Sequence, residues 1–246
     1  MRALVVVAVA AELTALETAL ASALGGGEPM ALGPLRATRV PTVAGEVVLL
    51  AGGVGPAAAA ASTATALSAF AQSASASASA SDAVDVVLSM GIAGGFAGHA
   101  IGSVLIGRRS LAADLGCQVT DRFLPLSELG FGVDHYDADA RWLALAVDRA
   151  RSTGRVVSVG DIATVSTVTG TAAAAAAHAA RHASAGEAME GFGVATAAAL
   201  FGVAFLEVRT ISNAVGPRDT SQWQLGDAFA ALGSVAAAVF GAELPW

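Results

Sequence analysis

Ala3-Leu4-Val5-Val6-Val7-Ala8-Val9 is an unbroken apolar run near the start of the chain, and it decides the fold class. A run without polar alternation is typical of a strand that is buried on both faces. Leucines then recur at helical spacing from Leu13 to Leu24, so a helix is expected directly after the strand. A buried strand followed by a helix is the opening unit of an α/β domain.

Other apolar runs of strand length follow, and segments with helical periodicity separate them. Strands are predicted at about 36–43, 46–51, 84–89, 103–106, 156–159 and 204–212, and helices at about 56–70, 139–153, 221–242 and from 171 and 191 onward. This alternation predicts an α/β fold of three layers, with a mostly parallel or mixed central sheet covered by helices on both faces. Ligands of such sheets bind beyond the carboxyl ends of the strands.

Some segments between these elements are predicted to be irregular. The glycine-rich stretches 52–56 and 90–96 each follow a strand and are expected to form turns. Residues 72–81 alternate Ser and Ala with no large side chain to bury, so we expect a flexible surface insertion there. Residues 114–136 show no periodicity. We expect residues 1–246 to form one domain that contains the Ser/Ala insertion.

The composition restricts the partners of the chain. Of its 246 residues 55% are hydrophobic, the formal net charge is −7 and the pI is near 5.0. A surface for nucleic acid or for an anionic membrane needs clustered basic residues, and the sequence contains no such cluster. The apolar stretches 3–11 and 47–81 are too short or too interrupted to cross a bilayer. Small molecules and copies of the same chain are therefore the expected partners.

Cysteine and histidine give little sign of a metal site. The single cysteine, Cys117, excludes an intrachain disulfide and a cysteine-based zinc site, so a reducing compartment, the cytoplasm, is expected. His178 and His182 are four residues apart on a predicted helix and could share a metal ion. Because no acidic residue or third nitrogen ligand lies near them in sequence, a solvated helix face is the favoured interpretation. No metal is expected.

Glu187-Ala188-Met189-Glu190-Gly191 is the stretch with the clearest functional pattern. Glu190 stands immediately before a run without any charge that continues to Leu206, so it lies at the start of a buried helix. At that position the helix dipole favours a carboxylate, which can accept hydrogen bonds from the hydroxyls of a ligand. A plain helix cap is the alternative.

Several enzyme classes lack their motifs in this sequence. The chain contains no lysine for a phosphate loop and no Gly-x-Ser-x-Gly elbow. A dinucleotide fingerprint at Gly53-Val54-Gly55 is weak, because the turn follows a later strand and Ala58 stands where the third glycine belongs. The carboxylates Glu12 and Glu190 remain, together with Asn213. This set is suited to binding a polyol and activating a water molecule.

Five motifs, in order along nearly the whole chain, resemble the purine nucleoside phosphorylase and methylthioadenosine nucleosidase superfamily. They are Ala10-Ala11-Glu12-Leu13, Gly53-Val54-Gly55, Gly91-Ile92-Ala93-Gly94-Gly95, Ala188-Met189-Glu190-Gly191 and Val208-Arg209-Thr210-Ile211-Ser212-Asn213. Phosphorylases of the superfamily carry an early Gly-Asp-Pro-type phosphate loop, where this chain has Val9-Ala10-Ala11-Glu12. The difference favours water as the nucleophile. Within the hydrolytic branch the chain is most similar to the futalosine hydrolases.

The resemblance implies a role for each candidate site residue. Glu12 would be the general base that polarises a water toward the anomeric carbon, and Arg209 would help to place this water. Glu190 would accept hydrogen bonds from the ribose hydroxyls, and Met189 would pack on the sugar. The implied base site contains Asn213, Ala93 and Gly94, with Thr164 and Val165, beside the segment 160–161, as a purine wall.

Two positions differ from the methylthioadenosine branch. Ile92 stands where that branch has a serine that touches the water, so one hydroxyl that would position the water is missing. Asn213 stands where adenine-specific members have Asp. An amide offers a donor for O6 and an acceptor for a protonated N7, so it fits hypoxanthine. A turn residue that satisfies its own backbone is the alternative for Asn213.

The activity that the resemblance implies is hydrolysis of the N-glycosidic bond of futalosine, which releases hypoxanthine and dehypoxanthine futalosine in menaquinone biosynthesis. No organic cofactor is expected. The protein is expected to form a homodimer or a higher homo-oligomer. Two alternatives stay open: a methylthioadenosine/S-adenosylhomocysteine nucleosidase, and a nucleoside-binding relative without turnover.

Overall fold

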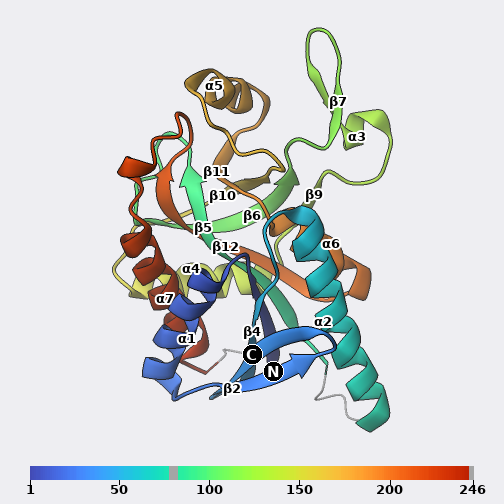
Figure 1. The fold of residues 1–246 in the computed structure, drawn as a ribbon, viewed down its shortest axis with the longest axis vertical. Coiled ribbons are helices and arrows are strands. Elements are labelled where there is room, and N and C mark those ends of the chain that lie inside the picture. The colour runs from blue at the N-terminus through green and yellow to red at the C-terminus, as the bar shows by residue number, and fades with distance from the viewer. Residues whose placement is uncertain (78–82, 244–246) are drawn as a thin grey trace.

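The computed structural model describes residues 1–77 and 83–243, and one mixed β-sheet forms its centre (Figure 1). The strands lie in the order β11-β10-β6-β12-β5-β1-β4-β3-β2, and β9 pairs with β6. Their bounds are β1 (Arg2–Val7), β2 (Glu28–Leu32), β3 (Leu35–Thr42), β4 (Gly45–Ala51), β5 (Val86–Gly95), β6 (Val104–Ala112), β9 (His135–Asp137), β10 (Val157–Thr164), β11 (Ser184–Ala188) and β12 (Ala204–Ala214). The expected mixed sheet is confirmed, because β5 pairs parallel with β1 and β12, whereas β12 pairs antiparallel with β6.

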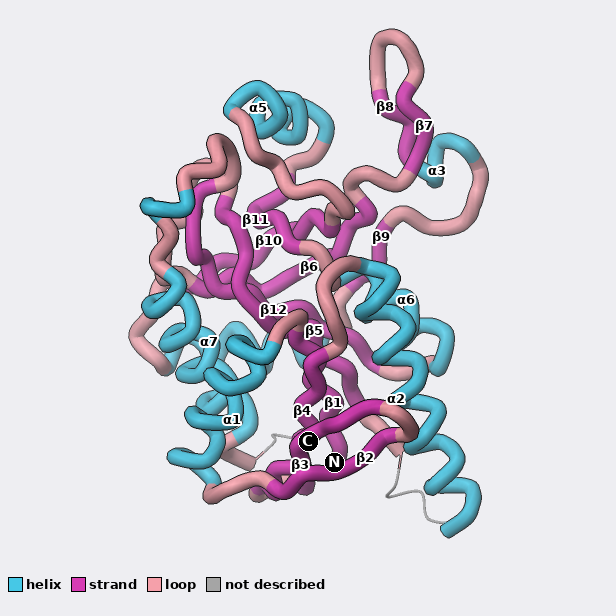
Figure 2. The backbone as a smooth tube through the Cα atoms, viewed as in Figure 1, coloured by secondary structure: helices cyan, strands magenta, loops and turns pink. Residues whose placement is uncertain are grey.

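Helices cover both faces of this sheet. Figure 2 shows α1 and α7 on one side of the strands, and α2 and α6 on the other. The helix bounds are α1 (Ala10–Leu24), α2 (Pro56–Ser77), α3 (Leu126–Leu129), α4 (Ala140–Ser152), α5 (Ala172–Arg181), α6 (Gly191–Phe201) and α7 (Leu225–Phe240), with a 3-10 turn at Thr220–Gln222. The three-layer arrangement predicted from the alternation of strands and helices is therefore confirmed.

The unbroken apolar character of β1 follows from this layering. Val5 packs in a core cluster with residues of α1, α4 and α7, whereas Leu4 and Val6 pack in a second cluster with residues of α2 and α6. Because successive side chains of a strand point to opposite faces, both sets must be apolar. The apolar run at residues 3–9 thus correctly predicted a strand that is buried on both faces.

Strand β5 continues through the glycine-rich segment, so the turn expected at 90–96 is wrong. Ile92 pairs with Thr210 of β12, and Gly94 pairs with Asn213 of β12 on one side and with Glu187 of β11 on the other. Hydrogen bonding to two neighbouring strands holds this segment extended, a constraint that local sequence does not contain. These pairings bring Asn213 and Glu187 to either side of one glycine.

Residues 72–77 belong to the helix α2, so the surface insertion expected from residue 72 is wrong for that part; residues 78–81 lie outside the described residues. The Ser73 and Ser75 hydroxyls donate hydrogen bonds to the carbonyls of Ala69 and Ala71, four residues earlier. The serines at 73 and 75 therefore satisfy their hydroxyls within the helix, and Ala has the highest helix propensity.

Short elements occupy the segment that shows no periodicity. β7 (Gly116–Gln118) and β8 (Phe123–Pro125) form a hairpin that projects beyond the end of the sheet next to α3 (Figure 1). β2, which was not predicted, pairs with β3 at the opposite end. No helix within residues 1–77 and 83–243 has both the length and the apolar character needed to cross a membrane.

His178 is buried, so the interpretation of α5 as a solvated face is wrong at this position. Only 3% of His178 is exposed, and its ring lies 4.7 Å from that of Phe96 and 5.2 Å from that of His182. Burial, with the nearby His182 and Arg181, lowers the pKa of His178 to about 4. Glu187 lies 3.9 Å from Nδ1, but Thr169 engages both of its carboxylate oxygens, so burial determines the direction of the shift.

This shift predicts a loss of stability in acid. An imidazole in the unfolded chain has a pKa of about 6.5, so between about pH 6.5 and 4 the unfolded state binds more protons than the folded state. The unfolding free energy therefore falls as the pH falls through this range. We expect His178→Leu to remove on the order of 3 kcal/mol of that dependence. Denaturant unfolding at pH 7.5, 5.5 and 4.5 measures it; a variant whose stability falls as steeply as that of the parent would contradict the prediction.

Candidate active site

A cavity of about 470 Å³ opens where β1, β5, β11 and β12 end. Among the residues that line it are Glu12, Ala93, Gly94, Glu187, Met189, Glu190, Asn213, Arg218 and Trp223. The volume suits a small-molecule ligand. Segments that are far apart in the sequence therefore supply one site, at the carboxyl ends of strands as expected for this type of sheet.

Glu12 enters this cavity from the first turn of α1, and only 3% of the residue is exposed. Its Oε2 accepts hydrogen bonds from the backbone N–H groups of Ala8 (2.9 Å) and Val9 (3.2 Å), and its Oε1 accepts one from Ile92 (2.9 Å). Donors from the segment after β1 and from within β5 thus hold one carboxylate in a single orientation. Ile92 acts on Glu12 through its backbone, although its side chain carries no hydroxyl.

Glu190 is the N-cap residue of α6, but its side chain makes no hydrogen bond to that helix. Instead, Oε1 accepts a hydrogen bond from the N–H of Gly55 (3.2 Å), and Oε2 lies 3.4 Å from Nη1 of Arg209. The residue is 6% exposed and lines the cavity. The plain helix cap is therefore wrong, because this carboxylate is directed away from the N–H groups of its own helix.

Arg209 lies fully buried and is not among the residues that line the cavity. Its Nε donates to Oε1 of Glu207 (2.9 Å), and its Nη2 donates to Oγ of Ser89 (2.9 Å). Burial opposes the charge, but the carboxylates of Glu207, Glu190 and Glu12 outweigh it and raise the pKa of Arg209. A permanent cation behind Glu190 positions that side chain. Its contacts are therefore those of a positioning residue rather than of a group that touches the ligand.

Gly91 allows Glu12 and Arg209 to approach the same point of β5. A Cβ atom at residue 91 would lie 2.5 Å from Oε1 of Glu12 and 2.6 Å from Nη1 of Arg209, closer than such atoms approach. At Gly191 a Cβ atom would lie 2.2 Å from Oε2 of Glu207. Both glycines are therefore required by the charged side chains that pack against them, not by an unusual backbone conformation.

Asn213 is half-buried at the wall of the cavity, next to Gly94. Its Oδ1 accepts a hydrogen bond from Oγ of Ser212 (2.8 Å), and its Nδ2 donates to the carbonyl of Ala214 (2.9 Å). A primary amide has two N–H donors and two lone pairs on its oxygen. Local bonds thus orient the side chain and leave one donor and one acceptor for a ligand.

Thr164 and Val165 do not line this cavity, in contrast to Ala93, Gly94 and Met189. Thr164 Oγ1 accepts a hydrogen bond from the N–H of Phe192 (2.9 Å) at the start of α6, and Val165 packs in a small cluster against Met189. The neighbouring Asp161 pairs with Arg108 and Arg109. The purine wall expected from Thr164 and Val165 therefore has no support in the geometry. Thr164 instead lines a second cavity together with Phe192.

Sequence reasoning gave no role to Glu187 or Glu207, two buried acids near the site. Glu187 lines the cavity, and its Oε1 accepts a hydrogen bond from the N–H of Thr169 (2.8 Å). Burial raises the pKa of Glu207, the partner of Arg209. The sequence pattern could have indicated this buried ion pair, because Glu207 and Arg209 are two residues apart and so lie on one face of an otherwise apolar strand.

A curated relative shares much of the sequence. The futalosine hydrolase of Streptomyces coelicolor is 46% identical over 150 residues, which span 60% of this chain and 62% of that protein. The match therefore covers less than two thirds of the relative's length.

Solved structures share the fold along nearly the entire chain. A 5′-methylthioadenosine/S-adenosylhomocysteine nucleosidase from Neisseria meningitidis superposes with a TM-score of 0.79 at 19% identity, covering 97% of each chain. The futalosine hydrolase of Helicobacter pylori superposes with a TM-score of 0.79 at 18% identity, also covering 97% of each chain. The sequence pattern of the phosphorylase superfamily matches residues 2–242. On this match the chain belongs to the phosphorylase superfamily.

Proposed function

We propose that this protein is a nucleosidase that hydrolyses the N-glycosidic bond of futalosine and releases hypoxanthine and dehypoxanthine futalosine, a step of menaquinone biosynthesis. The observation that carries the proposal is that Glu12 and Glu190 line one cavity of about 470 Å³ together with Asn213. The identity to the Streptomyces coelicolor futalosine hydrolase supports the choice of substrate.

In the proposed reaction Glu12 removes a proton from a water molecule as its oxygen bonds to the anomeric carbon of the ribose. The bond from this carbon to N9 breaks, its electron pair passes to the purine, and N7 takes up a proton from solvent. The sugar develops positive charge in the transition state, and buried carboxylates stabilise that charge. Glu190 holds the ribose hydroxyls, and Arg209 holds Glu190.

The test is a comparison of substrates with and without phosphate. The protein is incubated with futalosine, inosine and methylthioadenosine, and the free base is measured by chromatography. We expect hypoxanthine from futalosine at a rate that does not depend on phosphate. A requirement for phosphate would make the protein a phosphorylase, and faster release of adenine from methylthioadenosine would make it a methylthioadenosine nucleosidase. Binding without release of any base would identify a non-catalytic relative.

Base preference should depend on Asn213. Its free donor and acceptor match O6 and a protonated N7 of hypoxanthine, whereas an ionised Asp would set lone pairs against O6. A buried mismatch of this kind costs about 1 to 3 kcal/mol. We therefore expect Asn213→Asp to lower kcat/KM for inosine-type substrates by roughly ten- to hundredfold and to raise it for adenosine-type substrates. The measurement is the ratio of kcat/KM for the two bases with the same 5′ group. An unchanged ratio would make Asn213 a turn residue only.

We also propose that the protein acts in the cytoplasm as a homodimer or higher homo-oligomer. The exposed Leu200, with 79% of its surface accessible, and the adjacent Phe201 support an interface at the end of α6. The exposed free thiol of Cys117 is compatible with a reducing compartment. Light scattering measures the oligomeric state.

A further inference from the structure

The rim of the active-site cavity carries an arginine stacked on a tryptophan. The guanidinium carbon of Arg218 lies 5.1 Å from the centroid of the Trp223 ring, and both residues line the cavity. Arg218 is exposed, and Trp223 is half-buried. The exposed side chains of Val9 and Val54 line the same cavity. The rim thus combines one cation, one aromatic ring and apolar surface.

The Arg218 guanidinium is available to a ligand. No carboxylate within residues 1–77 and 83–243 forms an ion pair with it, although Asp219 is its neighbour in the chain. Asp219 instead accepts hydrogen bonds at Oδ1 from the N–H (3.0 Å) and the hydroxyl (2.6 Å) of Ser221. The loop is anchored by its backbone, because the Arg218 N–H donates to the carbonyl of Gly170 (3.1 Å). A fixed backbone therefore presents an unpaired guanidinium.

The other residues that line the cavity carry negative charge, so the Arg218 cation is needed only by an anionic ligand. Those residues include three carboxylates, Glu12, Glu187 and Glu190, and the Arg209 cation is buried outside the lining. With a net charge of −7, the chain as a whole repels anions as well. A neutral nucleoside needs no cation at the rim, whereas a ligand with a negative group does.

We propose that Arg218 and Trp223 form a subsite for an anionic aromatic group on the 5′ side of the nucleoside. The guanidinium pairs with a carboxylate through two parallel hydrogen bonds, and the Trp223 ring packs on the aromatic body. The inference rests on the proposed function, because the 5′ arm of futalosine carries an aromatic ring with a carboxylate. A methylthio group in that place has no charge and gains nothing from Arg218.

The test compares futalosine with its carboxamide, in which the carboxylate of the 5′ arm is replaced by an uncharged amide. For the parent protein we expect kcat/KM to be about 10- to 100-fold higher with the carboxylate. Arg218→Gln should remove most of this preference, and Arg218→Lys should restore only part of it, because lysine lacks the planar donor fork. Trp223→Leu should lower kcat/KM for both futalosine and its carboxamide. It should lower kcat/KM for inosine, which lacks the arm, much less.

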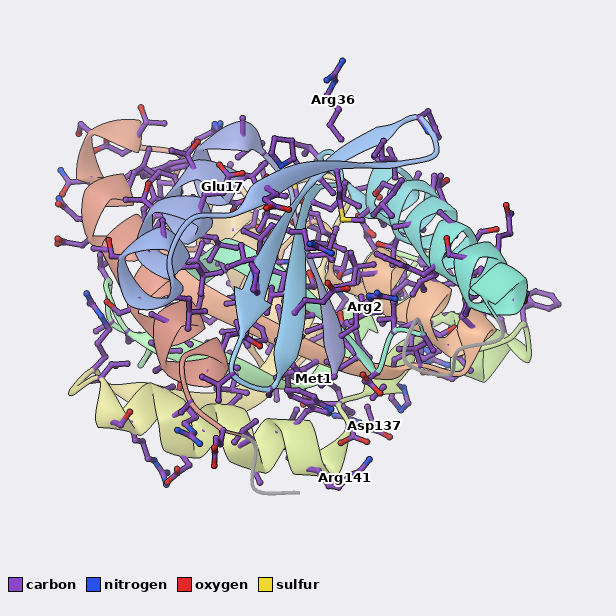
Figure 3. The ribbon with its side chains drawn as sticks, turned by 90° about the horizontal axis from the view of Figure 1, so that it is seen from below. Met1, Arg2, Glu17, Arg36, Asp137 and Arg141 are labelled. Atoms are coloured by element: carbon purple, nitrogen blue, oxygen red, sulfur yellow. The ribbon has the colours of Figure 1, made fainter. Side chains whose placement is uncertain are left out.

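Arg36→Gln is the matched control, because Arg36 is an exposed arginine that projects from β3 into solvent (Figure 3). This substitution should leave kcat/KM for futalosine and for its carboxamide unchanged. If Arg218→Gln lowered kcat/KM for futalosine and for its carboxamide by the same factor, Arg218 would be a structural residue and the subsite would be overturned.

Calorimetric titration separates the subsite from the proposed reaction. If the parent protein releases no hypoxanthine but binds futalosine more tightly than the carboxamide, and Arg218→Gln abolishes the difference, the subsite stands and the proposed reaction fails. Equal affinities of the parent protein for the two compounds overturn the subsite, whatever the turnover.

Discussion

Replacement of Glu12 by Gln is expected to lower kcat for nucleoside hydrolysis by about two to four orders of magnitude, the usual contribution of a general base. The amide is nearly isosteric with the carboxylate, and its single oxygen can still accept the hydrogen bonds from the N–H groups of Ala8 and Val9. Its NH₂ group then takes the place of Oε1 and loses the bond from the N–H of Ile92, but the volume of the side chain, and with it the shape of the ligand cavity, should be kept. Because the amide cannot take a proton from water, binding and chemistry should separate. The dissociation constant of the substrate is expected to change by a few-fold at most.

Glu17→Gln is the control for this experiment. Glu17 belongs to the same helix, but it accepts a hydrogen bond from Thr38 (2.6 Å) and does not line the cavity. Figure 3 shows it beside the strands of the N-terminal half. Single-turnover kinetics and calorimetry of both variants give kcat and affinity independently. Turnover of Glu12→Gln within a few-fold of the parent rate would reduce Glu12 to a residue that caps the start of α1.

Replacement of Glu190 by Ala is expected to lower both affinity and rate. A hydrogen bond to a charged group contributes about 1.5 to 3 kcal/mol, so the loss of two bonds to the ribose hydroxyls should lower kcat/KM by about 10² to 10⁴-fold. Poor orientation of the sugar for attack adds to the loss. A 2′-deoxynucleoside should be a poor substrate of the parent protein for the same reason.

The Ala variant also removes a neighbour of the buried Arg209 cation, which carries its own penalty in stability. Glu190→Gln keeps the volume of the side chain and an acceptor for the N–H of Gly55, so it separates recognition of the ribose from loss of structure. Unfolding midpoints of both variants should accompany the kinetics. Equal rates of the parent protein on ribo and deoxy substrates would remove Glu190 from the ribose site.

Much of the fold was determined by local sequence. The apolar run of β1 and the leucines of α1 carry the strand and helix periods directly, because a strand covered on both faces must be apolar at every position. The same argument predicted the buried strand β12 and the three layers. It failed at β5, whose glycines have no strand propensity and are held extended by pairing with β11 and β12.

The site shows the same division between local sequence and tertiary structure. The types of Glu12, Glu190 and Asn213, and their places after strands or at a helix start, were sufficient to predict that they share a cavity. Sequence could not decide that Thr164 and Val165 are absent from the cavity lining or that Arg209 is buried away from it. Nor could it decide that Arg218 stacks on Trp223 and forms no ion pair with any carboxylate of the described residues. These properties depend on which side chains occupy the surrounding volume, and contacts between residues distant in the chain arise only when the layers pack. Local sequence therefore determined the elements and the reactive groups, and packing decided which of these groups face the ligand.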